Sequence, residues 1–295
     1  MISIDGATKL AGVIGNPIGH TLSPAMHNAA YETLGLNWVY VPLLIKDEIG
    51  LRRFAAAAAG MSFVGFNITM PFKQGVLELC DEVAMAATMA GAVNTVHCVD
   101  GRLLGYNTDG RGLVESLESE ANFDVAGKRV VILGAGGAAG SALVSFVLSR
   151  AAEVVVLSRD PDAAEILVDR VRPHLNDSRA EASSLADAEQ HVGNAELIVN
   201  ATSLGMRSGD PSPVDASWLH EGQVVYDMVY GRRESTTLLT DARAAGARGF
   251  DGLGMLVAQG ATAIDIWNGD DQLRTPRDVM RQAAEEQLAT RGVVE

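Results

Sequence analysis

Short apolar runs alternate along most of the chain with longer segments in which apolar positions recur at helical spacing. The apolar runs predict buried strands at 9–14, 39–44, 63–68, 94–99, 102–105, 130–133, 153–157, 197–200 and 224–228. The helical segments are expected at 24–34, 49–60, 75–79, 81–89, 109–120, 138–150, 163–171, 254–267 and 277–290. Strands that alternate with helices in this way predict an α/β fold with parallel strands and helices on both faces of the sheet.

Turn and cap residues mark several of these boundaries. Ser23 followed by Pro24 is typical of a helix start, and we expect Ser23 to be the N-cap. The dipeptide Asp100-Gly101 separates two expected strands, which is a strong signal for a two-residue hairpin. Asp109 lies in a similar cap sequence and is a candidate N-cap of the helix that follows it.

The length of 295 residues favours two domains over one, because single hydrophobic cores stop growing near ~250–300 residues. A content of 47% hydrophobic and 20% charged residues is ordinary for a globular protein and argues against extensive disorder. The net charge of −14 disfavours a nucleic-acid partner, since phosphate binding needs a basic face.

Nothing in the sequence suggests a membrane or an export signal. No run approaches the ~18 uninterrupted apolar residues of a membrane span, and residues 1–10 lack the apolar core of a signal peptide. The cysteines Cys80 and Cys98 are typical of ordinary buried thiols in a reducing compartment. We therefore expect a cytoplasmic protein, and we assign no metal site.

A glycine-rich loop follows the expected strand at 130–133 and precedes a helix. Residues 134–139 carry a Gly-x-Gly-x-x-Ala pattern, in which Gly134 permits the tight turn and Gly136 lets a pyrophosphate approach the backbone. The helix that begins near Gly137 and Ala138 supplies unpaired N–H groups for the anion. This context of strand, loop and helix predicts a dinucleotide site rather than a purely structural turn.

Residues at the end of the second strand bear on the choice of cofactor. Folds that prefer NAD carry a carboxylate there for the ribose hydroxyls, whereas those that prefer NADP carry an arginine for the 2′-phosphate. Ser158 and Arg159 therefore favour NADP. The neighbouring Asp160 leaves NAD as an alternative, because its carboxylate could reach the ribose or neutralise Arg159.

Lys73 and Asp109 each lie among small polar and turn-forming residues. A lysine beside a carboxylate can give a proton to a developing alkoxide while a dinucleotide supplies hydride. Taken singly, Lys73 could also be an ordinary surface lysine and Asp109 an ordinary helix cap. Together with the glycine-rich loop, the pair predicts a nicotinamide-dependent oxidoreductase.

Six segments, read together, resemble the signatures of the shikimate dehydrogenase family, which includes shikimate and quinate dehydrogenases. They are 15–24, 67–73, 91–95, 105–110, 200–206 and 252–259, in the order found in that family. The resemblance implies an N-terminal α/β substrate domain made of 1–110 and 255–295, with the C-terminal helices packing back on it. It implies a Rossmann-type NADP-binding domain at 111–254.

The activity implied by the resemblance is the reversible, NADP-dependent reduction of 3-dehydroshikimate to shikimate. This is a CH–OH oxidoreductase step of the chorismate pathway to the aromatic amino acids. The resemblance assigns proton handling to Lys73 and Asp109. The substrate contacts that it implies, to a carboxylate and to ring hydroxyls, are Thr21, Ser23, Thr69, Asn94, Tyr230 and Gln259. The cofactor contacts that it implies are Gly134, Gly136, Gly137, Ala138, Ser158, Arg159, Thr202, Ser203, Met228, Gly252 and Met255.

Two departures from the family pattern leave alternatives open. Thr21 stands where biosynthetic members more often have serine, and threonine is compatible with relatives that take quinate. The segment 230–239 lacks the proline that usually follows the tyrosine and is one residue longer. The alternatives are a quinate/shikimate or aminoshikimate dehydrogenase of broader specificity, with NAD as the alternative cofactor, and a silent ligand-binding protein. Retention of both Lys73 and Asp109 argues against the silent protein, and a monomer and a homodimer are both compatible with the sequence.

Overall fold

The computed structural model describes residues 4–231, 235–270 and 272–291. The chain divides into two compact units. The first unit consists of Met1–Thr108 and Val257–Glu295, and the second unit of Asp109–Leu256. The sequence placed these divisions after residue 110 and before residue 255.

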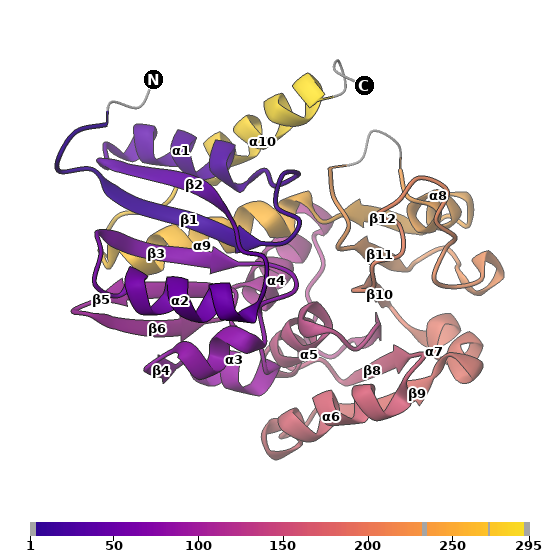
Figure 1. Cartoon of the computed structure of the whole chain (residues 1–295). Helices are drawn as coiled ribbons and strands as arrows, with labels where there is room; N and C mark the ends of the chain where they lie inside the picture. The colour runs from indigo at the N-terminus through magenta and orange to yellow at the C-terminus, as the bar shows by residue number, and fades with distance from the viewer. Residues whose placement is uncertain (1–3, 232–234, 271, 292–295) are drawn as a thin grey trace. The chain divides into compact units, whose positions relative to one another are not determined.

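The first unit is built on a six-stranded sheet in the order β2-β1-β3-β5-β6-β4 (Figure 1). Its elements in chain order are β1 (Lys9–Gly15), α1 (Ser23–Leu34), β2 (Trp38–Leu44), α2 (Glu48–Ala58), β3 (Phe63–Ile68), η1 (Gly75–Leu79), β4 (Glu82–Val83), α3 (Met85–Ala90), β5 (Thr95–Val99) and β6 (Arg102–Tyr106). The strands β1, β2 and β3 run parallel, whereas β5 runs antiparallel to both β3 and β6. This sheet is therefore mixed: the alternation of strands and helices predicted the parallel strands β1, β2 and β3, and the hairpin predicted at Asp100-Gly101 accounts for the antiparallel pair β5 and β6.

The reason for the mixed sheet is the predicted hairpin at Asp100-Gly101. Strands β5 and β6 pair directly, with Val99 opposite Arg102. Asp100 and Gly101 both have positive φ, at 50° and 74°, as a two-residue turn that matches the twist of its strands requires. A two-residue hairpin forces β5 and β6 to run antiparallel, whereas the connections from β1 to β2 and from β2 to β3 each contain a helix and allow parallel strands.

Three local expectations need correction. Ser23 lies inside α1, whose N-cap is Leu22 and lacks a side-chain cap bond, so the Ser23 hydroxyl is available for another role. The segment 81–89 is not one helix, because Glu82–Val83 pairs as a short strand with β6 before α3 begins. Cys80 and Cys98 are free thiols as expected, but both are only partly buried.

The C-terminal helices α9 (Leu253–Asn268) and α10 (Arg277–Arg291) return to the first unit, as the sequence predicted. In Figure 1, α2 lies in front of the sheet and α9 behind it. The indole Nε1 of Trp267, near the end of α9, donates to the carbonyl of Val96 in β5 (2.9 Å). A Cβ on Gly65 of β3 would lie 2.1 Å from this Nε1, so glycine is what lets α9 approach the strand.

The second unit contains a parallel sheet in the order β12-β11-β10-β7-β8-β9. Its elements are α4 (Asp109–Ala121), β7 (Arg129–Leu133), α5 (Gly137–Leu148), β8 (Glu153–Ser158), α6 (Pro161–Val171), η2 (Arg172–His174), β9 (Arg179–Ser184), η3 (Leu185–Asp187), α7 (Ala188–Asn194), β10 (Leu197–Asn200), η4 (Ala216–Trp218), β11 (Val224–Asp227), α8 (Thr237–Ala244) and β12 (Arg248–Asp251). The chain builds outward from β7 to β9 and then returns to β10 on the other side, which is the doubly wound order of dinucleotide-binding sheets.

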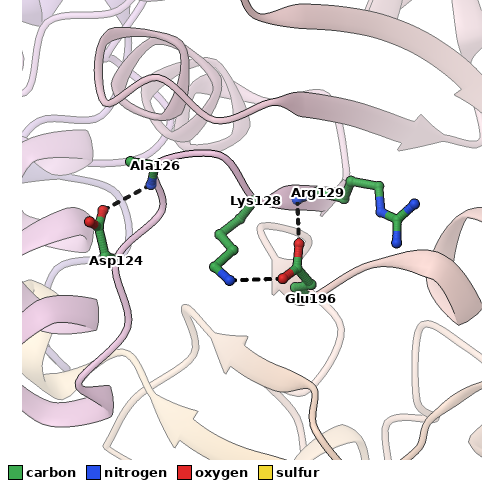
Figure 2. A network of polar contacts seen from close by, with 5 residues as sticks. All are labelled: Asp124, Ala126, Lys128, Arg129 and Glu196. Atoms are coloured by element: carbon green, nitrogen blue, oxygen red, sulfur yellow. Dashed lines mark hydrogen bonds and ion pairs between the residues drawn. The ribbon is translucent and has the colours of Figure 1, made fainter.

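The start of β7 is held by a polar network at the amino ends of the strands (Figure 2). Glu196 accepts from Lys128 Nζ (2.9 Å) and from the backbone N–H of Arg129 (3.1 Å). Both the Lys128 and the Glu196 side chains are 39% exposed, so their ion pair adds little to stability. Its effect is to fix where the loop before β10 meets β7.

Among the strands and α-helices described in this unit, sequence patterning missed β9, α7, α8 and β12, and it also missed the short helices η2, η3 and η4. The edge strands β9 and β12 carry polar and exposed residues because only one side of an edge strand has a neighbour. Helix α8 had a local signal, since the Thr236 hydroxyl caps it by accepting from the backbone N–H of Leu239 (3.4 Å). None of the helices in the described ranges combines the length and hydropathy needed to cross a membrane.

Candidate active site

Two loops at the carboxyl ends of β1 and β3 carry four of the predicted substrate and proton-handling residues of the first unit. They are joined by backbone bonds, because Asn16 N donates to Met70 O (3.0 Å) and Thr69 N donates to Ile14 O (2.8 Å). A Cβ on Gly15 would lie 2.4 Å from the Thr69 methyl group. Parallel strands end at the same edge of a sheet, so this edge gathers the loop of Thr21 and the loop of Lys73.

The predicted carboxylate-binding hydroxyls lie side by side at the start of α1. Thr21 Oγ1 donates to Ser23 Oγ (3.2 Å), and the backbone N–H of Ser23 donates to Thr21 Oγ1 (3.2 Å). Ser23 is buried, at 6% exposure. The pair thus offers two hydroxyls next to a helix start, where the helix dipole favours an anion.

Asn94 is the centre of a buried polar cluster within the first unit. Its Oδ1 accepts from the backbone N–H of Thr108 (2.8 Å), and its Nδ2 donates to Gln259 Oε1 (3.3 Å). The structure therefore brings together two predicted ring-hydroxyl contacts that lie far apart in the sequence, one before β5 and one on α9. Both side chains are buried, at 2% and 8% exposure.

The predicted proton pair is divided between the units. Lys73 is half-buried after β3, and its carbonyl accepts from the backbone N–H of Val93 (2.8 Å), one residue before Asn94. Asp109 is 5% exposed and is the first residue of α4, where the helix dipole stabilises a negative charge. Their mutual pairing stays a prediction.

The predicted dinucleotide loop of the second unit has the geometry that its sequence requires. Gly134 follows β7 with a φ of 105°, and a Cβ there would lie 3.1 Å from the Thr202 methyl group and 3.2 Å from the Ala201 carbonyl. Gly136 is the N-cap of α5, and a Cβ on it would meet no atom within 4 Å. The backbone of this loop therefore has room for a pyrophosphate above the helix start, so these residues fit a dinucleotide.

The end of β8 carries the residues that bear on NADP or NAD. Ser158 is the last residue of β8, and Arg159 is exposed. Asp160 is the N-cap of α6, and its Oδ1 accepts from the backbone N–H of Ala163 (3.2 Å). The structure therefore gives the Asp160 carboxylate a role as a helix cap, which does not depend on a contact with the cofactor ribose.

A buried network holds the loop of the predicted nicotinamide-side residue Thr202, and sequence reasoning missed its other members Asn200, Asp227 and Thr236. Asp227 accepts from Asn200 Nδ2 (2.9 Å), from the backbone N–H of Val229 (3.1 Å) and from Thr236 Oγ1 (2.6 Å). Asn200 Oδ1 in turn accepts from the backbone N–H and the hydroxyl of Thr202 (3.0 and 2.7 Å). The network therefore fixes the loop of Thr202 and Ser203 against the segment that contains Met228.

Asn200 and Asp227 are both fully buried. Burial raises the pKa of the Asp227 carboxyl, and the bonds donated by Thr236, Val229 and Asn200 act in the opposite direction. A signal for both residues was present in the sequence. Each ends an apolar run, and the carboxyl ends of parallel strands meet at one edge.

The remaining predicted cofactor residues lie at the same edge of this sheet. A Cβ on Gly252 would lie 2.3 Å from the Met228 carbonyl, so the ends of β11 and β12 nearly touch. The backbone N–H of Met255 donates to the Tyr226 hydroxyl (3.2 Å), which also bonds to Ser116 (2.9 Å). Tyr230 is half-buried. The segment 230–239, which departs from the family pattern, includes residues 232–234, and these three lie outside the described residues.

The doubly wound sheet and its glycine loop define a dinucleotide-binding protein of the nicotinamide-dependent oxidoreductase class. Two family models match this chain: the shikimate dehydrogenase substrate binding domain at residues 13–96 and shikimate / quinate 5-dehydrogenase at residues 116–206. The chain belongs to the shikimate dehydrogenase family, as the sequence motifs predicted.

Individual relatives resemble the chain over nearly its whole length. The shikimate dehydrogenase (NADP(+)) of Citrifermentans bemidjiense is 43% identical over 99% of this chain and 99% of its own. A crystal structure of a shikimate dehydrogenase in complex with NADP+ matches with a TM-score of 0.87 and 35% identity, over 97% of this chain and 98% of the other. Quinate dehydrogenase from Corynebacterium glutamicum, in complex with NAD, matches with a TM-score of 0.84 and 31% identity, over 94% and 98%.

Proposed function

We propose that this protein is an NADP-dependent shikimate dehydrogenase that catalyses the reversible reduction of 3-dehydroshikimate to shikimate. The observation that carries the proposal is the adjacent pair of hydroxyls on Thr21 and Ser23 (3.2 Å) in a chain of this family. Two hydroxyls beside a helix start suit a substrate with one carboxylate. The buried Asn94–Gln259 pair supplies amide groups for ring hydroxyls.

The cofactor proposed is NADP. Its pyrophosphate would be held by Gly134, Gly136, Gly137 and Ala138, and its 2′-phosphate by Ser158 and Arg159. The bound cofactor supplies the hydride that the carbonyl carbon of the substrate accepts. Thr202, Ser203, Met228, Gly252 and Met255 are proposed to line the nicotinamide side. Asn200 and Asp227 hold the loop of Thr202 and Ser203 against the segment of Met228.

The residues of this chain handle the proton that accompanies the hydride. Lys73 is proposed to hold a proton at Nζ, to give it to the developing alkoxide and to stabilise the charge on that oxygen. Asp109 orients the same hydroxyl and the Lys73 ammonium. Thr69 and Tyr230 are proposed to complete the contacts to the substrate ring and carboxylate.

The decisive experiment is a spectrophotometric matrix of shikimate and quinate against NADP+ and NAD+. We expect the highest kcat/KM for shikimate with NADP+. A clear preference for quinate with NAD+ would overturn both the substrate and the cofactor assignment. Absence of turnover in all four combinations, with nucleotide binding intact, would favour a silent ligand-binding protein.

A broader or different specificity is the second candidate function, with quinate or aminoshikimate as substrate and NAD as cofactor. Thr21 favours it, because its methyl group changes the carboxylate site relative to the more common serine. The structural likeness to a quinate dehydrogenase bound to NAD is compatible with it. We further propose that the protein is cytoplasmic and has no nucleic-acid partner. We propose that it is a monomer or a homodimer, and sedimentation and size-exclusion measurements would test this oligomeric state.

A further inference from the structure

The orientation of the Asn94 side-chain amide is determined by its neighbours. A backbone N–H can only donate, so the atom that faces the Thr108 N–H at 2.8 Å must be the amide oxygen. The amide nitrogen then faces Thr108 Oγ1 (3.0 Å) and Gln259 Oε1 (3.3 Å). A flip of the amide would set two donors against each other in a buried site.

A second amide, that of Asn67 at the end of β3, is oriented by the same kind of argument. Its Nδ2 donates to the backbone carbonyl of Asn94 (3.2 Å), which can only accept. Its Oδ1 accepts from the Tyr40 hydroxyl (2.7 Å). Asn67 is 6% exposed, so this arrangement is part of the buried core of the first unit.

The Thr95 hydroxyl connects the two amides. It accepts from Asn67 Nδ2 (3.0 Å) and donates to Asn94 Oδ1 (3.1 Å), and it lies 3.2 Å from the Thr108 hydroxyl. Thr95 is fully buried. Because the direction of each bond follows from a backbone partner, the chain from Asn67 through Thr95 to Asn94 has a single polarity.

We propose that Thr95 is a positioning residue for the reaction, which holds the Asn94 amide so that its N–H group is directed toward Gln259 and the substrate side. The inference rests on the proposed function, since it concerns the ring-hydroxyl contacts of Asn94 and Gln259. Thr95 acts through Asn94 and is not itself a substrate contact. Its effect is confined to the carbocyclic substrate, because the whole network lies in the first unit, whereas the predicted dinucleotide loop lies in the second.

The test compares Thr95→Val with Thr95→Ser. Valine has nearly the shape of threonine but removes the hydroxyl, whereas serine retains it. We expect Thr95→Val to lower kcat/KM for shikimate roughly tenfold, the effect of one buried hydrogen bond. The KM for NADP+ should stay within about twofold of the wild-type value, and Thr95→Ser should restore most of the loss in kcat/KM.

Thr262→Val is the matched control. Thr262 is also buried in the same unit, and the bond that its hydroxyl donates to the Ala258 carbonyl lies within α9 (3.0 Å), outside the network. This variant should lose stability as Thr95→Val does, while its KM for shikimate stays unchanged. Equal shikimate kinetics in Thr95→Val and Thr262→Val would overturn the positioning role.

A second variant covers the case in which Thr95→Val does not fold. Thr95→Ala removes the same hydroxyl with a smaller side chain and keeps the bond between the Asn94 amide oxygen and the Thr108 backbone N–H. It should raise the KM for shikimate several-fold, and an unchanged KM would contradict the inference. A wild-type protein that does not oxidise shikimate would instead defeat the proposed function, so the two failures are distinguishable.

Discussion

At the scale of single residues, the first unit combines polar groups that serve the proposed chemistry with polar groups that are simply enclosed. Lys73 and Asn94 belong to the first kind. His27 belongs to the second, because its ring is completely buried and is stacked on Tyr40 with centroids 4.0 Å apart. Within the described part of the chain, its Nε2 has no hydrogen-bond partner. Its Nδ1 bonds to the Ser23 carbonyl (2.9 Å), so the proton of the neutral ring is on Nδ1.

Lys73→Ala should fold and bind NADP+ but lose most of its turnover. Removal of a general acid typically lowers kcat by about 10²–10⁴-fold, and the lysine is not part of the buried core. Steady-state shikimate oxidation and a nucleotide titration measure the two properties separately. Lys46→Ala is the matched control, since Lys46 is an exposed lysine of the same unit. Near wild-type turnover in Lys73→Ala would remove Lys73 from the catalytic role.

His27 should make the stability of the protein depend on pH below neutrality. Burial lowers the pKa of His27 from 6.5 to about 4, because protonation would place an unpartnered N–H in the core. Between these values the unfolded chain binds a proton that the folded chain does not, so the free energy of unfolding falls as pH falls through this window. The total effect is roughly 3 kcal/mol.

Denaturant unfolding at a series of pH values from 7 to 4 measures this dependence. His27→Leu removes the titrating group and should flatten the curve between pH 6.5 and 4. An equally steep curve in this variant would show that other groups cause the acid sensitivity.

At the scale of elements, caps and edges explain both the successes and the failures of sequence patterning. Buried strands such as β3, in which every residue is buried, are largely apolar, with Asn67 as the polar exception in β3, and β3 was predicted at its observed bounds. The edge strands β9 and β12 were missed because exposure on one side removes the apolar run. Ser23 has the residue type of an N-cap, yet the turn of Thr21 and Leu22 starts the helix earlier and leaves its hydroxyl beside Thr21.

Asp160→Ala tests the cap of α6 against a role in cofactor choice. Loss of the side-chain cap bond should lower the free energy of unfolding by about 1 kcal/mol. The ratio of kcat/KM values for NADP+ and NAD+ should stay the same, because the Asp160 carboxylate is engaged by Ala163. Asp162→Ala, which removes a carboxylate from the first turn of the same helix without removing the cap, is the control. A changed cofactor ratio in Asp160→Ala alone would restore the ribose-binding alternative.

At the scale of the whole molecule, the first unit is made of two separate stretches of the chain, because residues from 257 onward join the unit formed by residues up to 108. The return is built on close packing between α9 and the first sheet. Gly65 and Trp267 make this contact, in which a glycine in a strand accommodates an indole ring. Gly260 of α9 likewise lies against His27 of α1 and Met280 of α10.

Gly65→Ala should destabilise the first unit through this contact. The added methyl group would lie 2.1 Å from the indole Nε1 of Trp267, and overpacking of this kind costs about 1–3 kcal/mol. Gly193→Ala is the control, because a Cβ there meets no atom within 4 Å and the residue lies in α7. Thermal unfolding of both variants would measure the difference, and equal stabilities would show that α9 can move away from β3 at little cost.

The periodicity of apolar positions, the glycine loop, the hairpin at Asp100-Gly101 and the family motifs could all be read from the sequence, because each depends on residues close together in the chain. The order of the strands could not, since it depends on which distant elements bury one another's apolar faces. The same holds for the polar networks. Asn94 meets Gln259, and Asn200 meets Asp227, only after the sheets have formed. Buried donors and acceptors need hydrogen-bond partners. This requirement fixes the orientation of the Asn94 and Asn200 amides, which the sequence motifs contain but whose orientation they do not determine.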